Sequence, residues 1–168
     1  MPVPLYSYIY HEYLRNFMGN QVSCGLTNEK DSMRYRMAYS FTAGDSMTLV
    51  LTPTGELFTN WGNHDFTKLP DKALAYAFAK NMGKFQKPLG ELLICGRMIA
   101  PLAWECETED FPAHRGYVCT TPKVLSTAWE LDGTRVQIFV NHTTEDVAVK
   151  VDGREIVVKA LDGAAIER

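Results

Sequence analysis

The first hundred residues alternate between two kinds of apolar pattern. Residues Leu5–Tyr10 are aromatic and β-branched and predict a strand that ends near His11. Residues 47–52 (MTLVLT) are continuous and largely apolar, as expected of a strand that is buried on both faces. Both segments are therefore predicted to be strands of a sheet.

Helical spacing follows each predicted strand. Met33, Met37 and Phe41 recur every four residues, which is the spacing of one helix face, and Gly44 suits the position just after the helix end. A second helix is predicted to begin at residues 70–71 (PD). The apolar residues that share its face are Leu74, Phe78, Met82 and Phe85. Strand, helix, strand, helix is the order of a parallel α/β sheet.

The last third of the chain has a different pattern. Residues 125–131 and 135–140 alternate like strands around the dipeptide Asp132-Gly133, which is a strong signal for a hairpin turn. Residues 147–151 and 155–159 do the same around a second Asp-Gly pair. We therefore expect two domains: an α/β part over residues 1–100, and an antiparallel β-sandwich module over residues 101–168.

Two βα units cannot form a covered parallel sheet by themselves, because both sheet edges would be exposed. The N-terminal part is thus expected to be the last quarter of a larger domain. Its exposed edges predict self-association, or pairing with a missing N-terminal segment of that larger domain.

Composition excludes several classes of partner. The chain has 168 residues, with Lys+Arg 17 against Asp+Glu 20 and a net charge of −3, and it has no basic run of the kind that nucleic-acid binding requires. It has no apolar stretch of about 20 residues that would cross a membrane, and its first residues predict no secretory signal. The four cysteines lack zinc-ligand spacing, so we expect no metal site.

Three segments carry a resemblance to a known family. Residues 3–13 (VPLYSYIYHEY), 36–45 (RMAYSFTAGD) and 96–102 (GRMIAPL) resemble a largely uncharacterised group of glycoside-hydrolase-like (β/α)8-barrel proteins. The hairpin at residues 126–141 is similar to the C-terminal β-module of that group. The resemblance implies the last two βα units of a (β/α)8 barrel followed by an antiparallel β-sandwich module, with Leu5–Tyr10 as strand seven.

The resemblance also points to one catalytic candidate. Glycosidases commonly use two carboxylates, and a glutamate after strand seven, here Glu12, would be the nucleophile. A substrate contact, or a solvated glutamate paired with Arg15, are the alternatives. His11 could bind a sugar hydroxyl or hold the charge of the neighbouring carboxylate.

A second group of candidates lies after residues 47–52, which the resemblance makes strand eight. Trp61 could form an aromatic platform for a sugar, and an anchor in the core is the alternative. Asn60 and His64 share that loop and are predicted to bind substrate. We expect Trp129 to be a core residue of the β-module, and the sequon at Asn141 to be a turn.

The leading functional prediction is a fragment of a glycoside hydrolase-like protein that acts on a carbohydrate, inactive as this chain alone and without a cofactor. The alternative from another class is a non-catalytic carbohydrate-binding or interaction module. A third hypothesis is a structural α+β domain whose sheet edge is covered by a partner.

Overall fold

The computed structural model describes residues 4–14, 30–46, 50–51, 53–55, 57–58, 71–112 and 117–168. Within these ranges the chain forms three helices, α1 (Leu5–Tyr10), α2 (Lys30–Thr42) and α3 (Lys72–Cys95). The strands are β1 (Val50–Leu51), β2 (Leu57–Phe58), β3 (Arg97–Ile99), β4 (Trp104–Glu105), β5 (Thr108–Pro112), β6 (Val118–Pro122), β7 (Val124–Leu131), β8 (Thr134–Asn141), β9 (Val147–Val151), β10 (Arg154–Val158) and β11 (Gly163–Glu167).

The fold is a mostly antiparallel β-domain. The prediction that the chain contains the last two βα units of a (β/α)8 barrel is therefore wrong. Every strand pairing in the described part of the chain is antiparallel. Leu5–Tyr10 is a helix, and β1, which lies within the predicted strand 47–52, pairs with β2. Residues 47–49 and 52 lie outside the described ranges. A parallel pair of strands joined by a crossover through α2 therefore does not form.

The error at α1 has a physical cause. The aromatic and aliphatic side chains of α1 remain exposed. Ser7 is buried within the helix, as are Pro4 and His11 at its two ends. Aromatic and β-branched residues favour strands when they can pack on a half-buried pleated surface. In the described part of the chain α1 lies near β3, but no strand pairs with residues 4–14, so the local preference does not decide the conformation.

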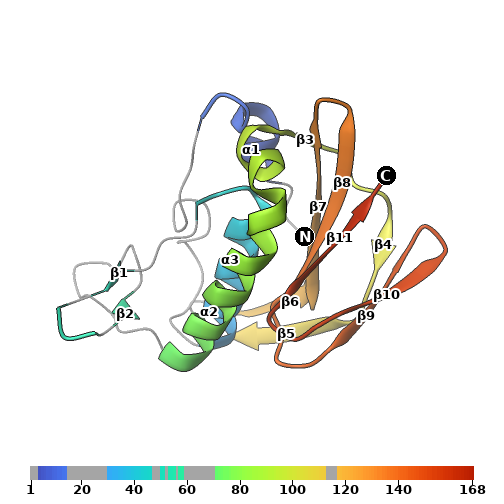
Figure 1. The fold of residues 1–168 in the computed structure, drawn as a ribbon. Helices are drawn as coiled ribbons and strands as arrows, with labels where there is room; N and C mark the ends of the chain where they lie inside the picture. The colour runs from blue at the N-terminus through green and yellow to red at the C-terminus, as the bar shows by residue number, and fades with distance from the viewer. Residues whose placement is uncertain are drawn as a thin grey trace.

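The domain has three layers (Figure 1). The four-stranded sheet β11-β8-β7-β3 lies in the middle. Helices α2 and α3 cover one of its faces, and the three-stranded sheet β10-β9-β4 covers the other. Strands β5 and β6 form a separate hairpin near one end of α2.

The middle sheet is buried on both faces because its side chains alternate between two cores. On the helix side, Leu125 and Trp129 of β7 pack with the buried residues of α2 and α3. On the other side, Val124 and Phe139 pack with the valines of β9. This alternation explains why β7 reads as an unbroken buried run from Val124 to Trp129.

Both predicted hairpins are confirmed. Strands β7 and β8 pair around Asp132 and Gly133, whose φ angles are 49° and 83°. Strands β9 and β10 pair around Asp152 and Gly153, with φ angles of 47° and 71°. Two successive positive φ values define the type I′ turn that suits the twist of a two-residue hairpin.

Both predicted helices are confirmed as well. In α2 the three residues at four-residue spacing, Met33, Met37 and Phe41, are all buried. In α3 the Asp71 carboxylate accepts a hydrogen bond from the Leu74 amide at 2.9 Å, so the helix begins with a side-chain cap. Of the helices in the described ranges, none combines the length and apolar character needed to cross a membrane.

Candidate functional site

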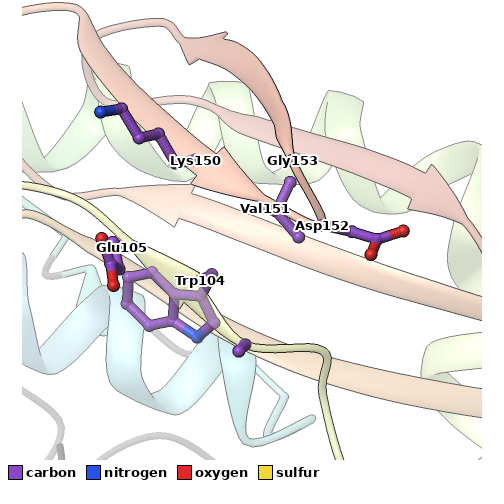
Figure 2. A pocket seen from close by; sticks show the side chains of 7 residues that line it. Trp104, Glu105, Lys150, Val151, Asp152 and Gly153 are labelled. Atoms are coloured by element: carbon purple, nitrogen blue, oxygen red, sulfur yellow. The ribbon is translucent and has the colours of Figure 1, made fainter.

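A hollow of about 230 Å³ opens where β4 meets the turn between β9 and β10 (Figure 2). Its lining comes from two segments, residues 103–105 and residues 150–153. The first segment contributes Trp104 and Glu105, and the second contributes Lys150 and Asp152. The hollow therefore combines one aromatic ring with charges of both signs.

Strand pairing places these side chains. Trp104 pairs with Val151, and Glu105 pairs with Lys150. Directly paired residues of antiparallel strands project from the same face. Because Val151 belongs to the core between the two sheets, Trp104 lies on that inner face. Glu105 and Lys150 consequently share the outer, exposed face.

The Trp104 indole is partly buried and packs against Phe139 on the side of the core. It packs on the second core and meets the Phe139 ring edge to face, with centroids 6.5 Å apart and an interplanar angle of 88°. The part of the ring that remains accessible faces the hollow. An indole fixed in this way is presented to a ligand with little loss of side-chain entropy.

A buried glutamine fixes the chain just before Trp104. The Gln137 side chain is fully buried on β8, where its Oε1 accepts from the Leu102 amide at 2.8 Å. Its Nε2 donates to the Leu102 carbonyl at 3.2 Å and to Ser126 Oγ at 3.0 Å. Gln137 is thus a positioning residue for β4, because it satisfies both backbone groups two residues before Trp104.

His11, predicted to contact substrate, is a buried packing residue. Its Nδ1 lies 3.1 Å from the Gly96 carbonyl oxygen and its Nε2 lies 3.1 Å from that of Gly44. Both neighbours are acceptors, so a neutral imidazole donates to one of them, and only the imidazolium donates to both. The described surroundings of His11 hold it between α1, the end of α2 and the start of β3.

Glu12, the predicted nucleophile, is exposed in the turn that follows α1. Its charge acts on the Arg97 guanidinium, whose pKa is raised first by the hydrogen bond to Glu130 and to a smaller extent by Glu12. The other candidates, Asn60, Trp61 and His64, lie outside the described residues. Their predicted roles in substrate binding therefore stay predictions.

Two structural interpretations of the sequence are confirmed. Trp129 is fully buried in the core on the helix side of the middle sheet. The Asn141 side chain forms a turn, because its Oδ1 accepts from the Thr143 amide at 2.8 Å. Its Nδ2 donates to the carbonyls of Glu145 and Val158, at 2.7 and 3.0 Å.

Sequence reasoning missed the site around Trp104. Its strand has only two residues, which is too short to show a period. The signal that was available is Gln137, a polar amide at the centre of an apolar strand, since a buried amide needs partners. Within the described ranges no cluster of three or more histidine, cysteine, aspartate or glutamate side chains could hold a metal ion.

Comparison of the chain with protein-family models, with curated proteins and with solved structures finds no match.

Proposed function

We propose that this chain is a non-catalytic carbohydrate-binding module and that the hollow at Trp104 is its binding site. The observation that carries the proposal is the partly buried Trp104 indole, packed on Phe139 from behind and open to a hollow in front. Aromatic faces bind the flat C–H faces of sugar rings through dispersion, and a few polar groups fix the orientation.

The charged side chains around the indole suit sugar hydroxyl groups. Glu105 and Asp152 offer carboxylate acceptors, and Lys150 offers an ammonium donor. A hydroxyl both donates and accepts, so a sugar hydroxyl at the rim of the hollow can pair with either kind of group, with Glu105 and Lys150 reached from the outer face of the strand pair and Trp104 from the inner face. These side chains are exposed, which keeps each hydrogen bond in competition with water.

The size of the hollow limits the affinity. Its volume of about 230 Å³ is below the range of roughly 300–1,000 Å³ typical of drug-sized ligand pockets. We therefore expect the hollow to contact one sugar ring and to bind it weakly. The expected dissociation constant is about 1 mM, which corresponds to a binding free energy of about −4 kcal/mol. Hydrolysis with Glu12 as nucleophile stays a separate prediction, since it requires a second carboxylate beside the scissile bond.

Titration of the 15N-labelled chain with a panel of oligosaccharides tests the proposal. The panel should contain β-1,4-linked and α-1,4-linked glucose, xylose and N-acetylglucosamine oligomers. Binding should shift the Trp104 indole signal and the amides of Glu105 and Lys150. Trp104→Ala should abolish the shifts, whereas Tyr76→Ala, which removes an exposed ring from α3, should leave them unchanged.

Because Trp104 also packs on Phe139, a second variant separates binding from folding. Asp152→Asn keeps a residue that tolerates the positive φ of the turn and removes only the charge. It should fold as the wild type does and bind several-fold more weakly. Saturating shifts that survive Trp104→Ala in a folded protein, or no shift with any sugar, would reject the site.

A further inference from the structure

The β5–β6 hairpin is attached to the rest of the domain largely by side chains. Its two strands pair with each other from Thr108↔Pro122 to Pro112↔Val118 and with no other strand of the described chain. In the described chain, backbone hydrogen bonds outside the hairpin ladder lie at its base: the Lys123 amide donates to the Glu107 carbonyl at 2.9 Å, and the Lys123 carbonyl accepts from the His142 amide of the body at 3.3 Å. The part of the hairpin beyond this base lies beside α2 (Figure 1).

One half of the attachment is apolar. Phe111 of β5 is buried and meets the buried Tyr35 ring of α2, with centroids 5.3 Å apart. Next to this contact, Ser32 Oγ donates to the Pro112 carbonyl at 3.1 Å. If the hairpin moved away from α2, both rings would be exposed to water.

The other half is charged and centres on Glu109 of β5. One carboxylate oxygen lies 3.0 Å from Nδ1 of His142, which is fully buried, and the other lies 3.8 Å from Nη2 of Arg34 on α2. Arg34 is fixed in turn, because it donates to the His142 carbonyl at 2.9 Å and to Asp31. Glu109 is therefore the one member of this charge cluster that the hairpin itself supplies.

The charges around Glu109 change the pKa of its carboxyl group more than its burial does. Burial acts to raise the pKa of the carboxyl group, but the contact with His142 and the charges of His142, Arg34 and Lys123 lower it by more, so the pKa lies below its ordinary value. Asp31 and Glu107 oppose this effect only partly, since they pair with Arg34 and Lys123 respectively. Tyr35 contributes a ring contact with His142 and is neutral at ordinary pH.

We propose that the negative charge of Glu109 holds the β5–β6 hairpin on α2, so that neutralising this one carboxyl group releases the hairpin and uncovers Tyr35 and Phe111 while the two-sheet body stays folded. Without that charge, Arg34 and His142 would face a neutral group in a poorly solvated place, and removing one partner of such a cluster is costly. The base of the hairpin keeps its contact between His142 Nε2 and the Pro122 carbonyl at 2.9 Å.

The direction of the acid response follows from the lowered pKa. A carboxyl group with a folded-state pKa below its unfolded value contributes stability above the unfolded pKa, which is about 4.3 for glutamate. That contribution is lost as the pH falls through the lower pKa of the folded state. Release is therefore an acid event, and glutamine at position 109 reproduces it at neutral pH.

Hydrogen exchange of the full chain at pH 7 tests the proposal. Glu109→Gln should accelerate exchange of the amides of residues 109–111 and 118–120 by about tenfold or more, because it removes one partner of a poorly solvated charge cluster. The amides of β7 and β8 should keep their wild-type protection. Asp110→Asn, on the exposed side of the same strand, is the matched control and should change neither region.

A pH titration of the wild type, followed by amide NMR signals, completes the test. The hairpin signals should move to those of Glu109→Gln as the pH falls below about 4, before the signals of β7 and β8 change. Unchanged hairpin protection in Glu109→Gln, equal effects of the two substitutions, or loss of hairpin and body together would each overturn the proposal.

Discussion

The His11 imidazole packs edge to face against the Trp129 indole, with ring centroids 4.5 Å apart and planes at 63°. Gly44 completes this contact. A Cβ atom at position 44 would lie 2.4 Å from His11 Nε2 and 2.6 Å from Trp129 Cη2. One aromatic pair and one glycine thus join α1, the end of α2 and the middle sheet.

Gly44→Ala should destabilise the protein strongly, for two independent reasons. The residue has a φ of +80°, which costs an L-residue about 1–2 kcal/mol, and the new methyl group would clash with two packed rings, at about 1–3 kcal/mol more. Urea unfolding should show a loss of about 3 kcal/mol. Gly153→Ala, at φ +71° with open space around it, isolates the backbone part and should lose only about 1 kcal/mol. Equal losses would show that the ring contact does not matter.

His11→Ala and Glu12→Gln should behave differently although they are neighbours. His11→Ala removes a side chain that contacts two carbonyls and fills space beside Trp129, so we expect a loss of about 2–4 kcal/mol of unfolding free energy. Glu12→Gln changes an exposed side chain and should stay within about 0.5 kcal/mol of the wild type.

A double substitution tests the packing directly. In the His11→Ala background, Gly44→Ala should cost less than it does in the wild type, because the nearest atom that the new methyl meets has been removed. Additive losses would contradict the contact between the two positions.

The sequence predicted those parts of the fold that short-range chemistry determines. Asp-Gly pairs between alternating strands define both hairpins, because their positive φ values are available at the level of the dipeptide. The four-residue spacing in α2 and the Asp71 cap of α3 are equally local. In each case the deciding residues lie within a few positions of one another.

The prediction failed where the outcome depends on distant partners. The aromatic run of α1 resembles a strand, but in the described part of the chain no strand pairs with it, although β3 lies near it. Trp104 reaches its place only through pairing with β9 and through the Gln137 side chain, both more than thirty residues away. No pattern local to Trp104 reports these contacts.

Gln137→Leu should therefore affect both stability and the site. Leucine has a similar size but leaves the Leu102 amide and carbonyl without the partners that the glutamine supplies, and Ser126 Oγ loses a donor. We expect a loss of about 2–4 kcal/mol in urea unfolding. The amide signals of residues 102–105 should broaden or shift, while those of the β7–β8 turn remain. Wild-type stability would show that Gln137 does not hold β4.

Alkaline pH should weaken the fold through Tyr35. Burial, followed by the charges of Cys119 and Tyr39, raises the pKa of this phenol to about 12, although a hydrogen bond with Thr121 acts in the opposite direction. A phenol is neutral below its pKa, so a raised folded-state value contributes stability that is fully present below the unfolded pKa of about 10. That contribution is lost as the pH rises towards the folded-state pKa.

Unfolding free energies at pH 9 and pH 11.5 test this expectation in a paired design. The wild type should lose about 2 kcal/mol more between the two values than Tyr35→Phe, which has no phenol to ionise at this position. Tyr76→Phe, at an exposed ring of α3, controls for the ionisation of surface tyrosines and should lose as much as the wild type. If Tyr35→Phe and the wild type lose the same unfolding free energy, ionisation of the buried phenol is not coupled to folding. The packing of Tyr35 against Phe111 and His142 would then not depend on the charge of the phenol.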